Sequence, residues 1–269
     1  MGLEERLSKR LAEARALALD ERFEEALQAY MDVFEDSRPS AGFAGVRLSY
    51  VLGETAAIGN RYAPARSKLF EMRNEKEKQI ISGDNSLSVL HEWSALNQAI
   101  DQKRPIQFYD ELKSADSENS KILKEIRNLI WQQLVAAKRY SEFTKEEVST
   151  QISNLATFTT MHSTQDFMRM TLSDDQRNLL MEFARRKLLE DGCSLFECAL
   201  ALNLNDMAGE ICKLVLDQEK TDDGYARLIR AATNASAITR ARELVTEAKA
   251  NLRADNLIKV SSAEQQIPR

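Results

Sequence analysis

A short turn pattern that recurs along the N-terminal half constrains the fold more than any other feature of this sequence. A charged or polar residue is followed by Arg and, in three of the four instances, by an aromatic residue. Each instance separates two apolar stretches. The arginines are Arg22, Arg61, Arg104 and Arg139, so the mean step is 39 residues. Repetition on this scale is typical of a helical solenoid, in which helix pairs stack on their neighbours.

Each repeating unit has the periodicity of two amphipathic helices joined by this turn. In the first unit, apolar residues recur every three or four positions over residues 7–18 and again over 23–34. That spacing is typical of helices with one buried face. The chain also has only nine glycines and four prolines, which disfavours the many turns of a β protein. We therefore expect an all-α fold of antiparallel helix pairs.

Small residues stand where the paired helices should meet. Ala14 and Gly53 lie on the first helices of the first two units, and Ala26 and Ala65 lie on the second helices. Such small side chains allow two backbones to approach closely. We interpret Gly53 as a packing residue and Gly59 as a helix end, where a left-handed conformation is easily accommodated.

The same positions resemble the tetratricopeptide repeat (TPR), whose unit pairs Leu-Gly on its first helix with an aromatic residue and Ala on its second. Leu52, Gly53, Gly59, Tyr62 and Ala65 carry the best match. The resemblance implies a right-handed α-solenoid that binds other polypeptides.

The resemblance also suggests how the chain is divided. It is good over residues 7–74, looser over 86–148 and 193–252, and lost over 149–190, which still looks helical. We expect TPR-like repeats in 1–148, a C-terminal helical region with degenerate repeats in 149–255, and a flexible tail in 256–269.

Charge and cysteine content limit the classes of partner and the compartment to be expected. With a net charge of -5, the chain lacks the excess of basic residues that binding to nucleic acid requires. Charged residues interrupt the N-terminal stretch, so it is neither a secretory signal nor a membrane span. The odd number of cysteines, three, fits a reducing compartment. A cytoplasmic protein that binds neither nucleic acid nor membrane is expected, with its oligomeric state open.

Residues that could carry catalysis are sparse. His91 and His162 are the only histidines, and neither has a neighbouring nucleophile and acid. Cys193, Cys198 and Cys212 lack the spacing of a zinc site and should be buried apolar residues. We expect no enzyme activity, no cofactor and no metal. An enzyme in segment 149–190 is a disfavoured alternative, in which Glu182, Glu190 and Asp191 are the acids that could hold a metal.

The concave surface lined by the first helices is the expected partner-binding site, because repeat solenoids bind extended segments there. The resemblance places Glu54 where a family subgroup grips a terminal carboxylate, and Glu54 would repel that group. A mixed polar groove is expected instead. Its candidate residues are Arg15, Tyr50, Glu54, His91, Gln98 and Gln132.

Two tryptophans lie on first helices, where a side chain can either line the binding groove or pack in the core. Trp93 and Trp131 should fill the space between neighbouring units, with a ligand anchor as the alternative.

The expected function is that of a protein-interaction scaffold or adaptor that binds a partner polypeptide. The alternative is a ligand- or peptide-gated regulatory solenoid that changes curvature and signals to a partner protein. The sequence does not name the partner.

Overall fold

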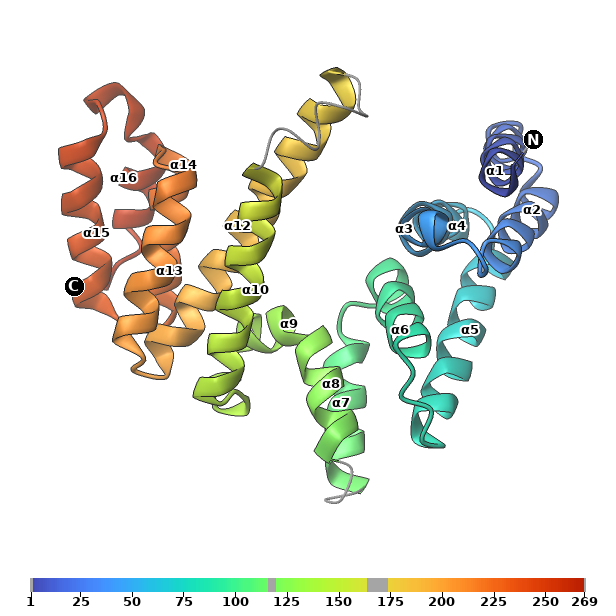
Figure 1. Ribbon diagram of the computed structural model, residues 1–269, viewed down its shortest axis with the longest axis horizontal. Helices are drawn as coiled ribbons and strands as arrows, with labels where there is room; N and C mark the ends of the chain where they lie inside the picture. Colours follow the sequence, from blue (N-terminus) through green and yellow to red (C-terminus); the bar gives the residue numbers. More distant parts are fainter. Residues whose placement is uncertain (1, 116–119, 164–173, 269) are drawn as a thin grey trace. The chain divides into compact units, whose positions relative to one another are not determined.

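The computed structural model describes residues 2–115, 120–163 and 174–268 (Figure 1). Most of these described residues are helical, and no strand occurs among them. The predicted all-α architecture of neighbouring helix pairs is therefore confirmed. The chain divides into two compact units, Met1–Gln133 and Leu134–Arg269, and each is described by itself.

The first unit is built from helix pairs in chain order. Helix α1 packs on α2, α4 packs on α5, and α5 packs on α6 (Figure 1). Its helices are α1 (Leu3–Leu19), α2 (Phe23–Asp36), the short 3-10 turn η1 (Ala41–Phe43), α3 (Ala44–Val46), η2 (Arg47–Val51), α4 (Leu52–Gly59), α5 (Ala63–Ile81), α6 (Leu87–Ile100), α7 (Arg104–Ala115) and α8 (Ser120–Leu129), with α9 (Trp131–Ala136) at the boundary.

The core of the first unit lies along the predicted apolar stripes. Ala14, Ala26 and Ala65 are completely buried, as expected of small residues where paired helices meet. Trp93 is also fully buried, and its ring centroid lies 5.4 Å from that of Phe108 on α7. Its indole therefore packs between α6 and α7, the two helices of one pair, and its Nε1 donates to Glu77 of α5 at 3.4 Å, so Trp93 is a core residue and not an exposed ligand anchor.

The close contact predicted for one glycine of the second pair is found at the other. A Cβ on Gly53 would meet no atom within 4 Å, because Gly53 faces solvent. A Cβ on Gly59 would lie 3.1 Å from Cβ of Arg66 and 3.2 Å from its backbone nitrogen. Gly59 is the last residue of α4, as predicted, but it does not have a left-handed φ. The close approach of α4 and α5 is therefore at Gly59, and the packing role assigned to Gly53 is wrong.

A π-helical turn interrupts the first helix of the second pair. Segment η2 has this wider turn, between α3 and α4. It places Arg47 and Val51 in the core and leaves Tyr50 60% exposed. Turns of this kind are often found at functional sites.

The second unit also consists of packed helices. Its first long helix, α10, packs on α12 and α13. The remaining contacts pair α12 with α13, α14 with α15, and α14 with α16 (Figure 1). The elements are η3 (Tyr140–Glu142), α10 (Lys145–Ser163), α12 (Asp174–Ala201), α13 (Asn205–Gln218), α14 (Asp222–Asn234), α15 (Ile238–Asn251), η4 (Ala254–Asn256) and α16 (Ile258–Glu264).

The C-terminal segment is a packed helix where a flexible tail was expected. Val260 and Ala263 of α16 are completely buried. Asp222, at the start of α14, accepts hydrogen bonds of 2.9 Å from the backbone N–H groups of Lys259 and Val260. Asp222 of α14 thus accepts from backbone N–H groups in the first turn of α16, which have no acceptor within their own helix. The apolar side chains of α16 are buried in the second unit.

One turn geometry recurs between paired helices. Glu21, Lys138, Asn203 and Ser236 each have a φ near +60°. The N–H group after each donates to a carbonyl five residues earlier, as in Arg22 to Leu17. This is the Schellman ending of a helix. What these four turns share is a left-handed residue, not an arginine. The turns at Asn60–Arg61 and Lys103–Arg104, which belong to the arginine pattern of the sequence, contain no left-handed residue.

Candidate functional site

Arg15 and Glu54, two of the predicted partner-binding residues, meet on the surface of the first unit. Arg15 comes from α1 and Glu54 from α4. The Nε of Arg15 donates to both carboxylate oxygens of Glu54 at 3.0 Å, and its Nη2 donates to Oε1 at 2.6 Å. The Arg15 side chain remains 46% exposed. The hydrogen bonds from Arg15 to Glu54 are the main cause that raises the pKa of Arg15.

Tyr30 on α2 holds the carboxylate of Glu54 in place from the buried side of the pair. Its hydroxyl donates to Oε2 of Glu54 at 2.9 Å, and its side chain is buried. Burial first, and then the hydrogen bond to Glu54, raise the pKa of Tyr30, so the hydroxyl stays protonated and remains a donor. Sequence reading missed this role because Tyr30 lies on a second helix and fits the apolar stripe.

Tyr50 adds an exposed aromatic ring beside the Arg15–Glu54 pair. It stands on the π-helical turn and is close enough to Arg15 to contribute to the raised pKa of that arginine. Exposed aromatic residues next to arginine are common anchors for protein partners. Arg15, Tyr50 and Glu54, together with Tyr30, are called the first-helix cluster below.

The other predicted residues lie on later helices. His91 and Gln98 are both exposed on α6 and, seven residues apart, share one face of that helix. Gln132 is half-buried on α9. In the described part of the chain, no hydrogen bond or ion pair connects His91 or Gln98 to the first-helix cluster.

A buried carboxylate on α6 is a feature that the sequence did not reveal. Glu92 is completely buried, and Nη1 atoms of Arg38 and Arg47 each donate to its Oε1 at 2.5 Å. Nζ of Lys76 lies 3.0 Å from Oε2, as an ion pair rather than an aligned hydrogen bond. Glu92 therefore joins the turn after α2 to η2, α5 and α6. Arg38, Arg47, Lys76 and Glu92 are called the Glu92 cluster below.

The charges of the Glu92 cluster decide the protonation state of its carboxyl. Burial alone would raise the pKa of Glu92, since it disfavours the charged form. The hydrogen bond from Arg47 and the positive charges of Lys76 and Arg38 outweigh burial and hold that pKa below its ordinary value. Glu92 is thus ionised, and a second carboxylate, Glu35, also binds Arg38 through two hydrogen bonds of 2.6 and 3.1 Å.

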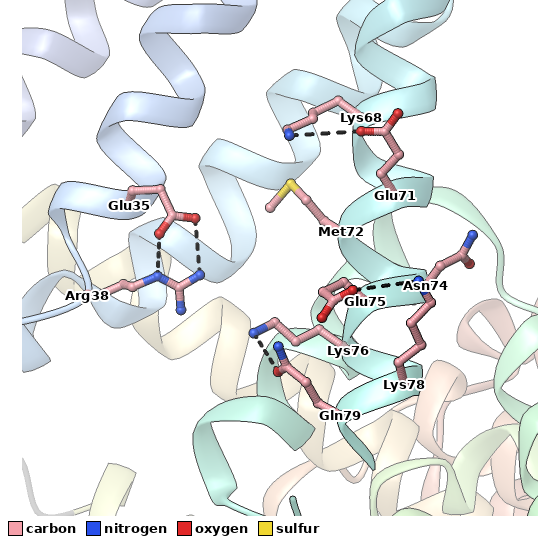
Figure 2. Close-up of a pocket in the computed structure, with 10 residues that line it drawn as sticks. All are labelled: Glu35, Arg38, Lys68, Glu71, Met72, Asn74, Glu75, Lys76, Lys78 and Gln79. Carbon is pink, nitrogen blue, oxygen red and sulfur yellow. Dashed lines mark hydrogen bonds and ion pairs between the residues drawn. The ribbon is translucent and has the colours of Figure 1, made fainter. Parts of the chain in front are cut away.

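A hollow of about 540 Å³ adjoins the Glu92 cluster, between α5 and the end of α2 (Figure 2). Lys68, Met72 and Lys76 are spaced four residues apart along α5, and their side chains extend towards Arg38 (Figure 2). The ten residues that line the hollow are Glu35, Arg38, Lys68, Glu71, Met72, Asn74, Glu75, Lys76, Lys78 and Gln79.

The cysteines have the environment of core residues. Burial is the main cause that raises the pKa of both Cys193 and Cys198 to about 12, so neither is a ready nucleophile near neutral pH. Cys212 is buried as well. The side chain of His162 lies outside the described residues.

Within the described residues, no group of three His, Cys, Asp or Glu side chains could hold a metal, and Glu182, Glu190 and Asp191 do not form one. No helix in the same part of the chain is both long and apolar enough to cross a membrane.

Comparisons with known proteins give little further identification. No protein-family model matches the sequence, and no curated protein is significantly similar to it. A solved structure titled "TPR2AB-domain:pHSP90-complex of yeast Sti1" matches with 15% identity over 98% of both chains, at a TM-score of 0.23. At that score the likeness decides neither fold nor function, and the fold assignment rests on the helix pairs themselves.

Proposed function

We propose that this chain is a TPR-like interaction scaffold or adaptor that binds a partner polypeptide on the concave face of its first helices, without catalysing a reaction. The observation that carries the proposal is the first-helix cluster. Its polar groups are held in place by the fold, while Tyr50 and much of Arg15 face solvent. A preorganised surface of this kind loses little side-chain entropy on binding.

The cluster favours one kind of partner group. Glu54 neutralises Arg15, so the pair offers no net positive charge to a terminal carboxylate. Nη1 of Arg15 makes no hydrogen bond within the described part of the chain, and it can donate to a backbone carbonyl of the partner. The ring of Tyr50 supplies an apolar surface for a partner side chain. We infer that the cluster binds an uncharged stretch of extended polypeptide.

Substitution of Tyr50 tests this proposal. Tyr50→Ala should leave stability within about 0.5 kcal/mol of the parent because the residue is exposed, yet it should greatly reduce the yield of partners captured from an extract of the source cells. Ile81→Ala is the matched control, because Ile81 is 64% exposed at the end of α5. Equal capture by the parent and Tyr50→Ala would reject the proposal.

A gated regulator is the second candidate, and the Glu92 cluster is the observation that favours it. The cluster joins the turn after α2 to η2, α5 and α6 and adjoins the hollow, so a ligand bound there would change how these segments are held. A ligand that binds only the folded state raises the melting temperature by mass action. A panel of metabolites and peptides that leaves the melting temperature unchanged would count against this candidate.

The site and the composition also support a proposal for the compartment and the class of partner. We propose that the protein acts in the cytoplasm, with another protein rather than nucleic acid or membrane as its partner. Its acidic net charge of -5 and its three free cysteines support this.

A further inference from the structure

The hollow between α2 and α5 has a cationic floor and a mixed rim. On the floor, the Lys76 side chain is only 14% exposed and that of Arg38 is 36% exposed. The carboxylates Glu71 and Glu75 are 71% and 59% exposed, so they lie at the rim. Lysines are exposed at the rim as well, with Lys78 at 76% and Lys68 at 47%, so the rim carries both signs of charge while the less exposed charged groups are cationic.

The charges of the Glu92 cluster and of Glu35, which binds Arg38, do not balance. The cations are Arg38, Arg47 and Lys76, and the carboxylates that bind them are Glu92 and Glu35. One positive charge remains. Elsewhere on the rim, Lys78 lies 3.8 Å from Glu75, and Lys68 lies 3.9 Å from Glu71. These rim pairs are exposed and weak, and an incoming anion can replace Glu71 at Lys68.

The spacing of the cations indicates the shape of the ligand. Lys68 and Lys76 are eight residues apart on α5, with Met72 midway, and at about 1.5 Å per residue their stems are about 12 Å apart. In an extended peptide, residues i, i+2 and i+4 share one face, and the outer two are about 13 Å apart. Two acidic residues flanking an apolar one therefore match this row.

We propose that the hollow is a second binding site, which takes an extended acidic peptide with the pattern acidic-x-apolar-x-acidic. One carboxylate binds at the floor beside Lys76 and Arg38, the apolar side chain packs on Met72, and the other carboxylate binds Lys68 (Figure 2). This site lies between second helices, so it goes beyond the proposed binding face on the first helices and does not depend on it.

Fluorescence anisotropy of the full chain with a labelled peptide tests the proposal. The probe is Glu-Ser-Leu-Ser-Glu, and the comparison is Glu-Glu-Leu-Ser-Ser, which has the same composition and charge. The first peptide should bind at least tenfold more tightly, and its affinity should fall as salt is added. Equal binding of the two peptides, or displacement of both by inorganic phosphate with equal ease, would reduce the site to a general attraction for anions and overturn the proposal.

A matched pair of lysine variants locates the site. Lys68→Glu should weaken binding of the first peptide at least tenfold, and Lys68→Arg should retain it. Lys213→Glu makes the same charge change at an exposed lysine of α13 in the second unit and should alter binding by less than twofold. Circular dichroism should show all three variants folded. Binding by Lys68→Glu at the parental affinity would contradict the assignment.

One further variant separates this inference from the proposed function. Tyr50→Ala should bind the acidic peptide as the parent does, because Tyr50 does not line the hollow. Loss of peptide binding in Tyr50→Ala would show that the peptide occupies the first-helix face, which contradicts the inference and leaves the proposed function standing.

Discussion

Arg47 and Glu92 form a buried ion pair, with Nη1 of the arginine 2.5 Å from Oε1 of the glutamate and both side chains removed from solvent. Arg47 comes from the π-helical turn and Glu92 from α6, so the pair ties the second helix pair to the third. Removing one partner of such a pair leaves the other charge buried without compensation.

Glu92→Gln should therefore lower the free energy of unfolding by about 3–5 kcal/mol, measured by urea denaturation. Glu35→Gln is the control, because Glu35 binds the same Arg38 but its side chain is 58% exposed. That substitution should cost about 1 kcal/mol or less. Equal effects of the two substitutions would show that burial of Glu92 has no energetic consequence.

Acid should weaken the fold through the same residue. The pKa of Glu92 is lowered in the folded state, so its contribution to stability is present above its ordinary pKa of about 4.5. That contribution is lost as the pH falls through the lowered folded value. Melting temperatures measured from pH 7 to pH 3 should fall less steeply below pH 4.5 in Glu92→Gln than in the parent. Parallel curves would contradict the assignment.

The two glycines of α4 should respond in opposite directions to alanine. Gly53→Ala should stabilise by about 0.5–1 kcal/mol, because Gly53 is exposed within a helix and its Cβ would meet nothing. Gly59→Ala should destabilise by about 1–3 kcal/mol, since the new Cβ would press on the backbone of Arg66. Thermal melts of both variants check the assignment, and a stabilised Gly59→Ala would refute the close approach of α4 and α5.

The cap on α16 predicts a further effect on stability. Asp222→Ala should lower the free energy of unfolding by about 1 kcal/mol, the usual value of a lost helix cap, because two backbone N–H groups of α16 lose their acceptor. Asp206→Ala is the control, since Asp206 is an exposed acid in the first turn of α13. The interpretation fails if chemical denaturation shows the same stability for both variants.

Much of the fold could be predicted from the sequence because helix pairs leave a periodic signal. Apolar stripes predict both helices of the first pair, and Ala14, Ala26 and Ala65 predict where helices meet. Gly53 and Gly59 are different, because spacing alone does not show which glycine faces a neighbouring backbone. The ordered α16 was missed because its apolar contacts are with α14, and its cap, Asp222, lies far away in the sequence.

The candidate site could be predicted only in part, for a related reason. Arg15, Tyr50 and Glu54 lie on first helices at repeating positions, so their common face could be inferred. Glu92 could not be recognised, because a charged residue in a helical pattern is read as solvent-exposed. Its burial depends on Arg38, Arg47 and Lys76, which the fold brings together from other helical segments.

Photo-crosslinking at position 50 tests the proposed binding face most directly. A photoreactive benzoylphenylalanine replaces Tyr50 in one variant and Ile81 in another, and both are irradiated in an extract of the source cells. If a partner polypeptide binds the first-helix face, position 50 should form a discrete crosslinked species that unlabelled protein competes away, and position 81 should not. Absence of a crosslink at position 50, or the same species at both positions, would contradict the proposal.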